Sequence, residues 1–247
     1  MGYIKTKGII LKEVNTGEAD KILTIFTKSH GRITGSAKGA RRPKNKLSAG
    51  TQFLCYSDLV LFKGKDMYSI SSIDIIEPFY KIRSDVYKLT YSAHIVDLIL
   101  DVIQENQSAT KVLQLFLNSL HMLANTDRNP ELITRIFEIR FLSILGYAPY
   151  VKECMECGSQ DLELNYLFSF KKCGVICSQC KVKDPYAMDI SQGTFRALRH
   201  IIYSPLDELF SFELSQTVLN ELAKLNRRYL RERLERDYTK LDFLKSL

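Results

Sequence analysis

Two pairs of cysteines constrain this sequence more than any other feature. Cys154 and Cys157 form one C-x-x-C pair, Cys177 and Cys180 form another, and nineteen residues separate the pairs. This spacing is typical of a structural zinc site, in which each pair directs two thiolates at one tetrahedral metal ion. Gly158 follows the first pair, where the chain must turn sharply. We therefore predict a four-cysteine zinc site; the alternatives are a cluster without metal or a pair of disulfides.

The chain carries no signal for export or membrane insertion. The N-terminus lacks the apolar segment of a signal peptide, and no apolar run reaches the length of a membrane span. We expect a cytoplasmic protein with reduced cysteines, which favours metal over disulfides. A fifth cysteine, Cys173, lies close enough in the sequence to substitute for a ligand.

Positive charge is concentrated in the first third of the chain. Residues 1–80 carry 13 Lys/Arg against 7 Asp/Glu, whereas residues 81–247 carry 22 against 21. A local basic surface attracts polyanions through counterion release, so nucleic acid is the first expectation and an anionic membrane the second. The alternative is a solvated basic face without a partner.

The first part of the chain has the pattern of a small barrel. Short runs rich in β-branched and aromatic residues alternate with turn signals, at residues 3–14, 21–27, 32–37, 51–62 and 67–76. Five strands with one long loop fit an OB-type barrel over residues 1–79. Six rings are available for base stacking, although core packing is the commoner role for each: Tyr3, Phe26, Phe53, Tyr56, Phe62 and Tyr68.

The long loop of this barrel contains the strongest functional signal. From Lys21 to Ser57 the chain has eight Lys/Arg and no acidic residue. Gly39, Pro43 and Gly50 exclude a regular helix, so we expect the charges to lie on a flexible or extended loop. Guanidinium groups can fork onto phosphates and stack on bases. The loop therefore favours nucleic-acid binding.

The rest of the chain has helical periodicity, interrupted by the cysteine pairs. Apolar spacing predicts helices from Ser84 onward, over 109–123, over 129–146 with Asn129 as cap and Pro130 at the first position, over 190–202 and over 215–247. Residues 166–170 alternate like a strand. We predict an α+β, multidomain chain whose helical domain, residues 80–149 and 181–247, contains a zinc-binding insertion at 150–180. Arginines and acids alternate on the last helix, which favours a solvated face over a supplementary DNA contact.

No catalytic motif is recognisable. The phosphate-binding glycine loops, the nucleophile elbow and the H-E-x-x-H zinc motif are all missing from the sequence, and the four histidines are scattered. A site with four cysteine ligands has no open position for substrate. We therefore expect a protein that is not an enzyme.

Several short segments of the chain form a specific combination. They are Gly17–Lys21, Phe26-Thr27, His30-Gly31, Ala37–Pro43, Phe137-Glu138, Leu145–Pro149, the two cysteine pairs with Gly158, Phe168–Phe170, Gly174-Val175 and Leu241–Leu244. Together these segments resemble the bacterial recombination mediator RecO family. The resemblance covers the whole chain. It implies an N-terminal OB fold, a helical C-terminal domain and an inserted zinc element. The family usually has Gly-Gly where this chain has Cys173-Gly174. The extra thiol leaves Cys177 and Cys180 in register with the family pattern, so we expect that Cys173 is not a metal ligand.

The resemblance also implies a function. Proteins of this family bind single- and double-stranded DNA and anneal complementary strands. With RecR, they help RecA replace single-strand DNA-binding protein, whose acidic tail is a further partner; RecF is an indirect one. The DNA contacts carried over are Lys38, Arg41 and Arg42, with Lys44 and Lys46 included by their position in the loop. The rival hypotheses are a zinc-stabilised nuclease and a zinc-ribbon transcriptional regulator.

Overall fold

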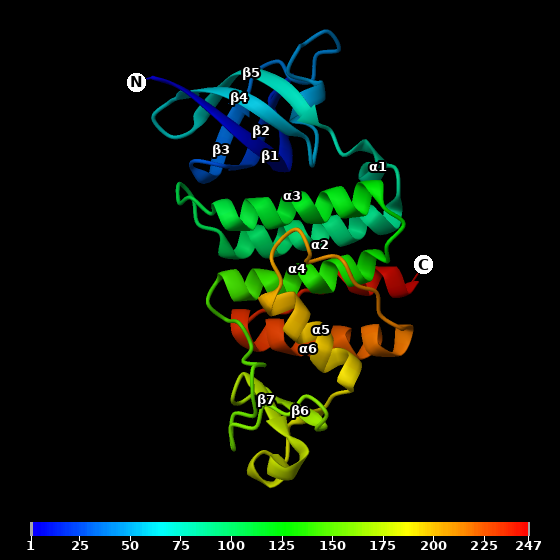
Figure 1. The fold of residues 1–247 in the computed structure, drawn as a ribbon. Coiled ribbons are helices and arrows are strands. Elements are labelled where there is room, and N and C mark those ends of the chain that lie inside the picture. The colour runs from blue at the N-terminus through cyan, green and yellow to red at the C-terminus, as the bar shows by residue number, and fades with distance from the viewer. Residues whose placement is uncertain (1, 247) are drawn as a thin grey trace. The chain divides into compact units, whose positions relative to one another are not determined.

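The computed structural model describes residues 2–246; Met1 and Leu247 lie outside the described part of the chain. The chain divides into two compact units, one ending at Thr126 and the other beginning at Asp127 (Figure 1). Within residues 2–126, the first unit therefore contains three α-helices in addition to the strands that precede them.

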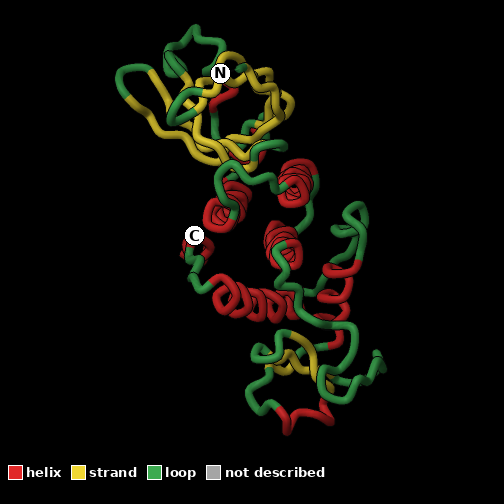
Figure 2. The backbone as a smooth tube through the Cα atoms, turned by 90° about the vertical axis from the view of Figure 1, so that its left-hand side faces the viewer, coloured by secondary structure: helices red, strands yellow, loops and turns green. Residues whose placement is uncertain are grey.

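A closed five-stranded barrel forms the N-terminal part of the first unit (Figures 1 and 2). Its strands are β1 (Tyr3–Thr16), β2 (Asp20–Thr27), β3 (Gly31–Ala37), β4 (Tyr56–Lys63) and β5 (Tyr68–Glu77). Their order is β1-β2-β3-β5-β4, and β4 pairs back onto β1. All pairs are antiparallel except β3–β5. This arrangement confirms the predicted OB-type barrel.

Alternation of side chains along the strands fills the barrel interior. Every second residue of β3 is buried, because successive side chains of a strand point to opposite faces. Ile10, Leu23, Ile25 and Leu61 meet in the core from neighbouring strands. The predicted fourth strand begins too early: Ala49–Thr51 form a 3-10 turn, and β4 starts only at Tyr56.

Three helices complete the first unit: α1 (Tyr80–Arg83), α2 (Val86–Val102) and α3 (Thr110–Asn125). The side chain of Asp85 caps α2 by accepting from the backbone N–H groups of Tyr87 and Lys88. Between α2 and α3 the chain returns to the β2–β3 turn, where the hydroxyls of Ser108 and Thr110 donate to the carbonyl of Lys28.

The second unit is built on three helices: α4 (Pro130–Ile144), α5 (Gln192–Tyr203) and α6 (Gln216–Leu234). Asn129 caps α4 and Pro130 is its first residue, as predicted. The prediction of a helix continuing to Leu247 is wrong. The helix ends at Leu234 because Glu235 adopts a left-handed conformation, and a 3-10 segment, η3 (Lys240–Ser246), follows. Asp242 of this segment pairs with Arg227, so the tail folds back on α6.

A small sheet holds the cysteine-rich segment between α4 and α5. Its antiparallel strands β6 (Tyr166–Ser169), β7 (Gly174–Cys177) and β8 (Met188–Asp189) lie in the order β7-β6-β8. All residues of β6 and β7 are buried. Among the described residues, no helix is both long and apolar enough to cross a membrane.

Candidate nucleic-acid interface and metal centre

The basic loop, residues 38–48, leaves the barrel after Ala37 at the end of β3. It is held against the turn between β1 and β2. The backbone N–H of Gly39 donates to a carboxylate oxygen of Asp20 at 2.7 Å. The N–H of Arg41 donates to the carbonyl of Ala19 at 2.9 Å. Gly39 has a φ of +66°, a conformation that glycine adopts without steric cost. The backbone of the loop is therefore attached to the barrel at its start.

The same loop is a run of consecutive turns, rather than the flexible or extended segment expected. N–H groups donate three residues back, from Arg42 to Gly39, from Asn45 to Arg42 and from Ser48 to Asn45. The side chain of Asn45 also bonds the carbonyl of Lys38 and the N–H of Leu47. These bonds give the loop a defined backbone conformation.

The loop presents its charges to solvent. Its five predicted DNA contacts are all exposed: Lys38, Arg41, Arg42, Lys44 and Lys46. Ala40, which lies between them, is fully buried in the barrel core. Leu47, which follows Lys46, packs against the same core. The apolar residues thus anchor the loop while the cations stay in water, where they can reach phosphate groups.

The six rings of the barrel divide between core and surface. Phe26 is fully buried and Tyr68 is 7% exposed, so both serve in packing. Phe53, Tyr56 and Phe62 are half-buried. Tyr3 is different, because 71% of it is exposed.

Part of the barrel surface is already occupied by the helical part of the first unit. The guanidinium of Arg32 on β3 donates to the carbonyl of Leu100 at 2.5 Å, and the carbonyl of Arg32 accepts from the N–H of Asn106 at 2.9 Å. The start of β3 is therefore covered by the link between α2 and α3. The side chains of Lys28 and Ser29 in the β2–β3 turn remain exposed.

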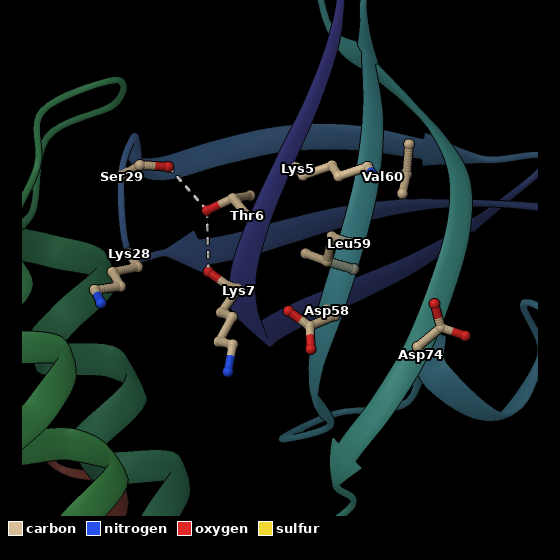
Figure 3. Close-up of a pocket in the computed structure, with 9 residues that line it drawn as sticks. All are labelled: Lys5, Thr6, Lys7, Lys28, Ser29, Asp58, Leu59, Val60 and Asp74. Atoms are coloured by element: carbon tan, nitrogen blue, oxygen red, sulfur yellow. Dashed lines mark hydrogen bonds between the residues drawn. The ribbon is translucent and has the colours of Figure 1, made fainter.

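A pocket of about 490 Å³ opens on the barrel beside β1 (Figure 3). Lys5, Lys7 and Lys28 line it, together with Asp58 of β4 and Asp74 of β5. The sequence does not predict this pocket, because its lining comes from three strands and a turn. The available signal was the alternation of Tyr3, Lys5 and Lys7, which places these three residues on one face of a strand.

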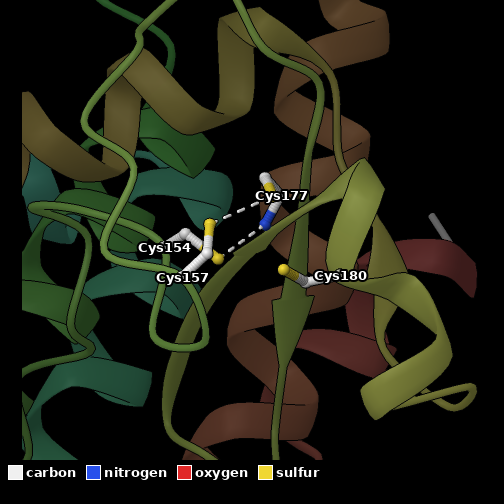
Figure 4. A group of neighbouring side chains, drawn as sticks. All are labelled: Cys154, Cys157, Cys177 and Cys180. Carbon is white, nitrogen blue, oxygen red and sulfur yellow. Dashed lines mark hydrogen bonds between the residues drawn. The ribbon is translucent and has the colours of Figure 1, made fainter.

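The four predicted cysteines converge in the second unit (Figure 4). Their sulfur atoms all lie within 4.8 Å of one another. The Sγ atoms of Cys157 and Cys177 are 3.7 Å apart, and a tetrahedral metal with sulfur ligands at 2.3 Å requires sulfur–sulfur separations of about 3.8 Å. Gly158, with a φ of +72°, makes the turn that follows the first pair. The donor set and its spacing fit a divalent metal.

Backbone N–H groups stabilise the thiolate form of Cys154, which is the form that binds a cation. Burial raises the pKa of the Cys154 thiol, but N–H groups that include those of Cys177, at 3.2 Å, and Glu156, at 3.5 Å, outweigh it and lower the pKa to about 7. Burial and hydrogen bonding to the other cysteines raise the pKa of Cys180 to about 12. A bound cation would favour the thiolate form of every ligand.

Cys173 lies outside this group. It occupies a left-handed position in the β6–β7 turn with a φ of +57°, and its sulfur accepts from the guanidinium of Arg233 at 3.0 Å. Arg228 of α6 is also engaged locally: it pairs with Glu232 and stacks over Phe170, with its guanidinium carbon 3.8 Å from the ring centre. These contacts agree with a solvated helix face of mixed charge.

Comparison with known proteins gives the same result for both parts of the chain. Residues 1–79 match the family model described as "Recombination protein O N terminal", and residues 83–242 match "Recombination protein O C terminal". A DNA repair protein RecO of Acetivibrio thermocellus is 59% identical over 247 residues, covering 100% of this chain and 98% of that protein. Proteins of the same name from Caldicellulosiruptor saccharolyticus and Alkaliphilus metalliredigens are 39% and 33% identical, and each alignment covers 99% of both chains.

Proposed function

Because this chain belongs to the RecO family of DNA repair proteins, we propose that it acts as a recombination mediator that binds single- and double-stranded DNA without covalent chemistry. The basic loop is the observation that carries the proposal. Its five exposed cations stand on a backbone that is bonded to the barrel. Cations held in this way neutralise phosphates and bring two strands close, which favours annealing.

The proposal includes the partners that the family resemblance implies. The protein acts with RecR, and together they help RecA to replace single-strand DNA-binding protein, whose acidic tail it binds. A strand-annealing assay on DNA covered by single-strand DNA-binding protein, with and without RecR, tests this part. Product formation on labelled DNA with added Mg²⁺ would instead indicate a nuclease.

We propose zinc as the resident metal of the second unit. Four thiolates are soft ligands, and a tetrahedral all-sulfur site is the usual structural zinc site. Cys154, Cys157, Cys177 and Cys180 would hold one ion. The ion would link Cys154 and Cys157, in the segment between α4 and β6, to Cys177 at the end of β7 and to Cys180. This link would stabilise the small sheet.

The deciding experiment is a salt titration of DNA binding. The Arg41→Ala, Arg42→Ala, Lys44→Ala triple variant should flatten the slope of log affinity against log salt, by about two for single strands and about three for duplex, because fewer counterions are released. A matched control removes three exposed lysines from outside the loop: Lys111→Ala, Lys152→Ala and Lys224→Ala. An equal slope for wild type and the loop variant would contradict the assignment of the loop.

A further inference from the structure

The outer face of β1 and β4 carries rings and cations in a regular order. Tyr3, Lys5 and Lys7 alternate along β1 and are all exposed. Tyr3 lies opposite Phe62 of β4, and Lys7 lies opposite Asp58. One face of this strand pair thus changes, within five residues, from aromatic to cationic.

The cationic end of this face is the lysine pocket. In Figure 3 the amino groups of Lys7 and Lys28 extend on the same side of β1. The hydroxyl groups of Thr6 and Ser29 lie 2.8 Å apart beside them, and they also bond the carbonyl of Lys7 and Nδ1 of His30. Among the described residues, no salt bridge joins the pocket lysines to Asp58 or Asp74. Their positive charge therefore remains available to a ligand.

The aromatic end is preorganised for stacking. The ring of Tyr3 packs edge-on against Phe62, with the ring centres 5.6 Å apart and an angle of 62° between the planes. This contact fixes the ring while 71% of Tyr3 stays exposed. A fixed, exposed ring next to lysines is the combination that binds single-stranded nucleic acid.

We propose that the β1–β4 face is a single-strand binding site, in which an unpaired base stacks on Tyr3 and an adjoining phosphate enters the pocket of Lys5, Lys7 and Lys28. The inference rests on the proposed DNA-binding function and adds a second site to it. Bases of a duplex already stack on one another, so this site selects unpaired strands. Asp58 and Asp74 repel phosphate from the β5 side of the pocket, which directs the backbone toward Lys28.

This face lies far from the basic loop on the same hairpin. Gly8 pairs with Thr27 beside the lysine pocket, whereas Thr16 pairs with Asp20 at the turn that holds the basic loop. Gly8 and Thr16 are eight positions apart along β1, which corresponds to about 26 Å of strand at 3.3 Å per residue. The two sites are therefore independent, and a short oligonucleotide engages only one of them at a time.

The test compares single-strand and duplex affinity in the full-length protein. Tyr3→Ala should weaken binding of a single-stranded oligonucleotide about tenfold and duplex binding less than twofold, whereas Tyr3→Phe, which keeps the ring, should stay within twofold of wild type. The Lys5→Ala, Lys7→Ala, Lys28→Ala variant should flatten the single-strand salt slope by about two. A 2-aminopurine base in the oligonucleotide should lose fluorescence on binding to wild type and not on binding to Tyr3→Ala.

The outcomes separate the two proposals. If wild type shows no salt-dependent DNA binding, the proposed function fails, and this site fails with it. If wild type binds and the loop variant is weakened, but the Tyr3 and lysine variants behave like the Lys111/Lys152/Lys224 control, the β1–β4 site alone is overturned. The lysine variant changes only exposed side chains, so it decides the question even if Tyr3→Ala unfolds.

Discussion

Arg135 and Glu138, three residues apart on α4, form a buried ion pair in which one guanidinium nitrogen lies 2.9 Å from each carboxylate oxygen. Glu138 is completely buried, and Asn226 of α6 donates to it at 3.2 Å. Burial would lower the pKa of Arg135, but the charges of Glu138 and Glu131 outweigh it and hold the pKa above its usual value. The pair therefore stays charged inside the second unit and links α4 to α6.

Removing one partner of this pair should be costly. Glu138→Ala leaves the Arg135 charge buried without its carboxylate, and we expect a loss of about 3–5 kcal/mol in the free energy of unfolding. Glu131→Ala is the matched control, because Glu131 is a partly exposed second partner of Arg135 at 3.3 Å; it should cost less than about 1 kcal/mol. Urea denaturation measures both. Equal losses would mean that burial of the pair has no special effect.

Gly31 should tolerate no side chain. It has a φ of +60°, and a Cβ there would lie 1.9 Å from the carbonyl oxygen of Gln107 in the α2–α3 link. We expect Gly31→Ala to destabilise the first unit by about 3 kcal/mol or more. Gly17 has a similar φ of +53° with no atom within 4 Å of a Cβ, so Gly17→Ala should cost only about 1 kcal/mol. Thermal melts of the two variants should differ clearly.

Loss of the metal should affect stability before DNA binding. Cys154→Ser should abolish binding of one zinc ion per chain and lower the unfolding midpoint, while single-strand affinity of the folded protein changes less than twofold. Cys173→Ser should retain the metal, because Cys173 lies outside the cluster. Metal content by mass spectrometry and unfolding by circular dichroism provide the measurements. Complete loss of DNA binding by a chelated but folded protein would place the metal in the DNA site.

Metal affinity should rise with pH, because protons compete with the cation for sulfur. In the metal-free site the pKa of Cys180 is about 12, so this thiol must release a proton whenever metal binds at neutral pH. Burial also raises the pKa of Cys177, so this thiol releases a second proton at neutral pH, and Cys154, with a pKa of about 7, adds a third only below that pH. The slope of log affinity against pH should therefore be at least two at pH 8 and increase by about one below pH 7. Competition with a chelator measures it, and a slope of zero would exclude thiolate ligation.

The sequence predicts most elements of this fold because their signals are local. Alternation defines the barrel strands, and Asn129 with Pro130 marks the start of α4. The errors arise where backbone conformation overrides side-chain pattern. Leu54, with a φ of +64°, delays the start of β4, and Glu235 ends α6 although the arginine-rich pattern continues. Neither residue type reveals a left-handed conformation in advance.

The two candidate sites differ in how far sequence could locate them. The sequence locates the metal ligands because the spacing of the two C-x-x-C pairs is a local pattern. It locates the basic loop because the charged residues lie close together in the sequence. The lysine pocket depends on strand register: Lys28 belongs to a turn that only the pairing of Gly8 with Thr27 brings beside Lys7. No pattern within a single segment contains that information.

The attachment of the basic loop to the β1–β2 turn also bears on the order of folding. Hairpins β1–β2, β2–β3 and β4–β5 join neighbouring segments and can form early, whereas β1–β4 and β3–β5 pairing must first close the chain across residues 38–55. Ala40 and Leu47 reach the core only after that closure. We expect the cations of the loop to acquire their fixed positions in the last step of barrel folding, so an unclosed intermediate would present them as an unstructured polycation with indiscriminate affinity for nucleic acid.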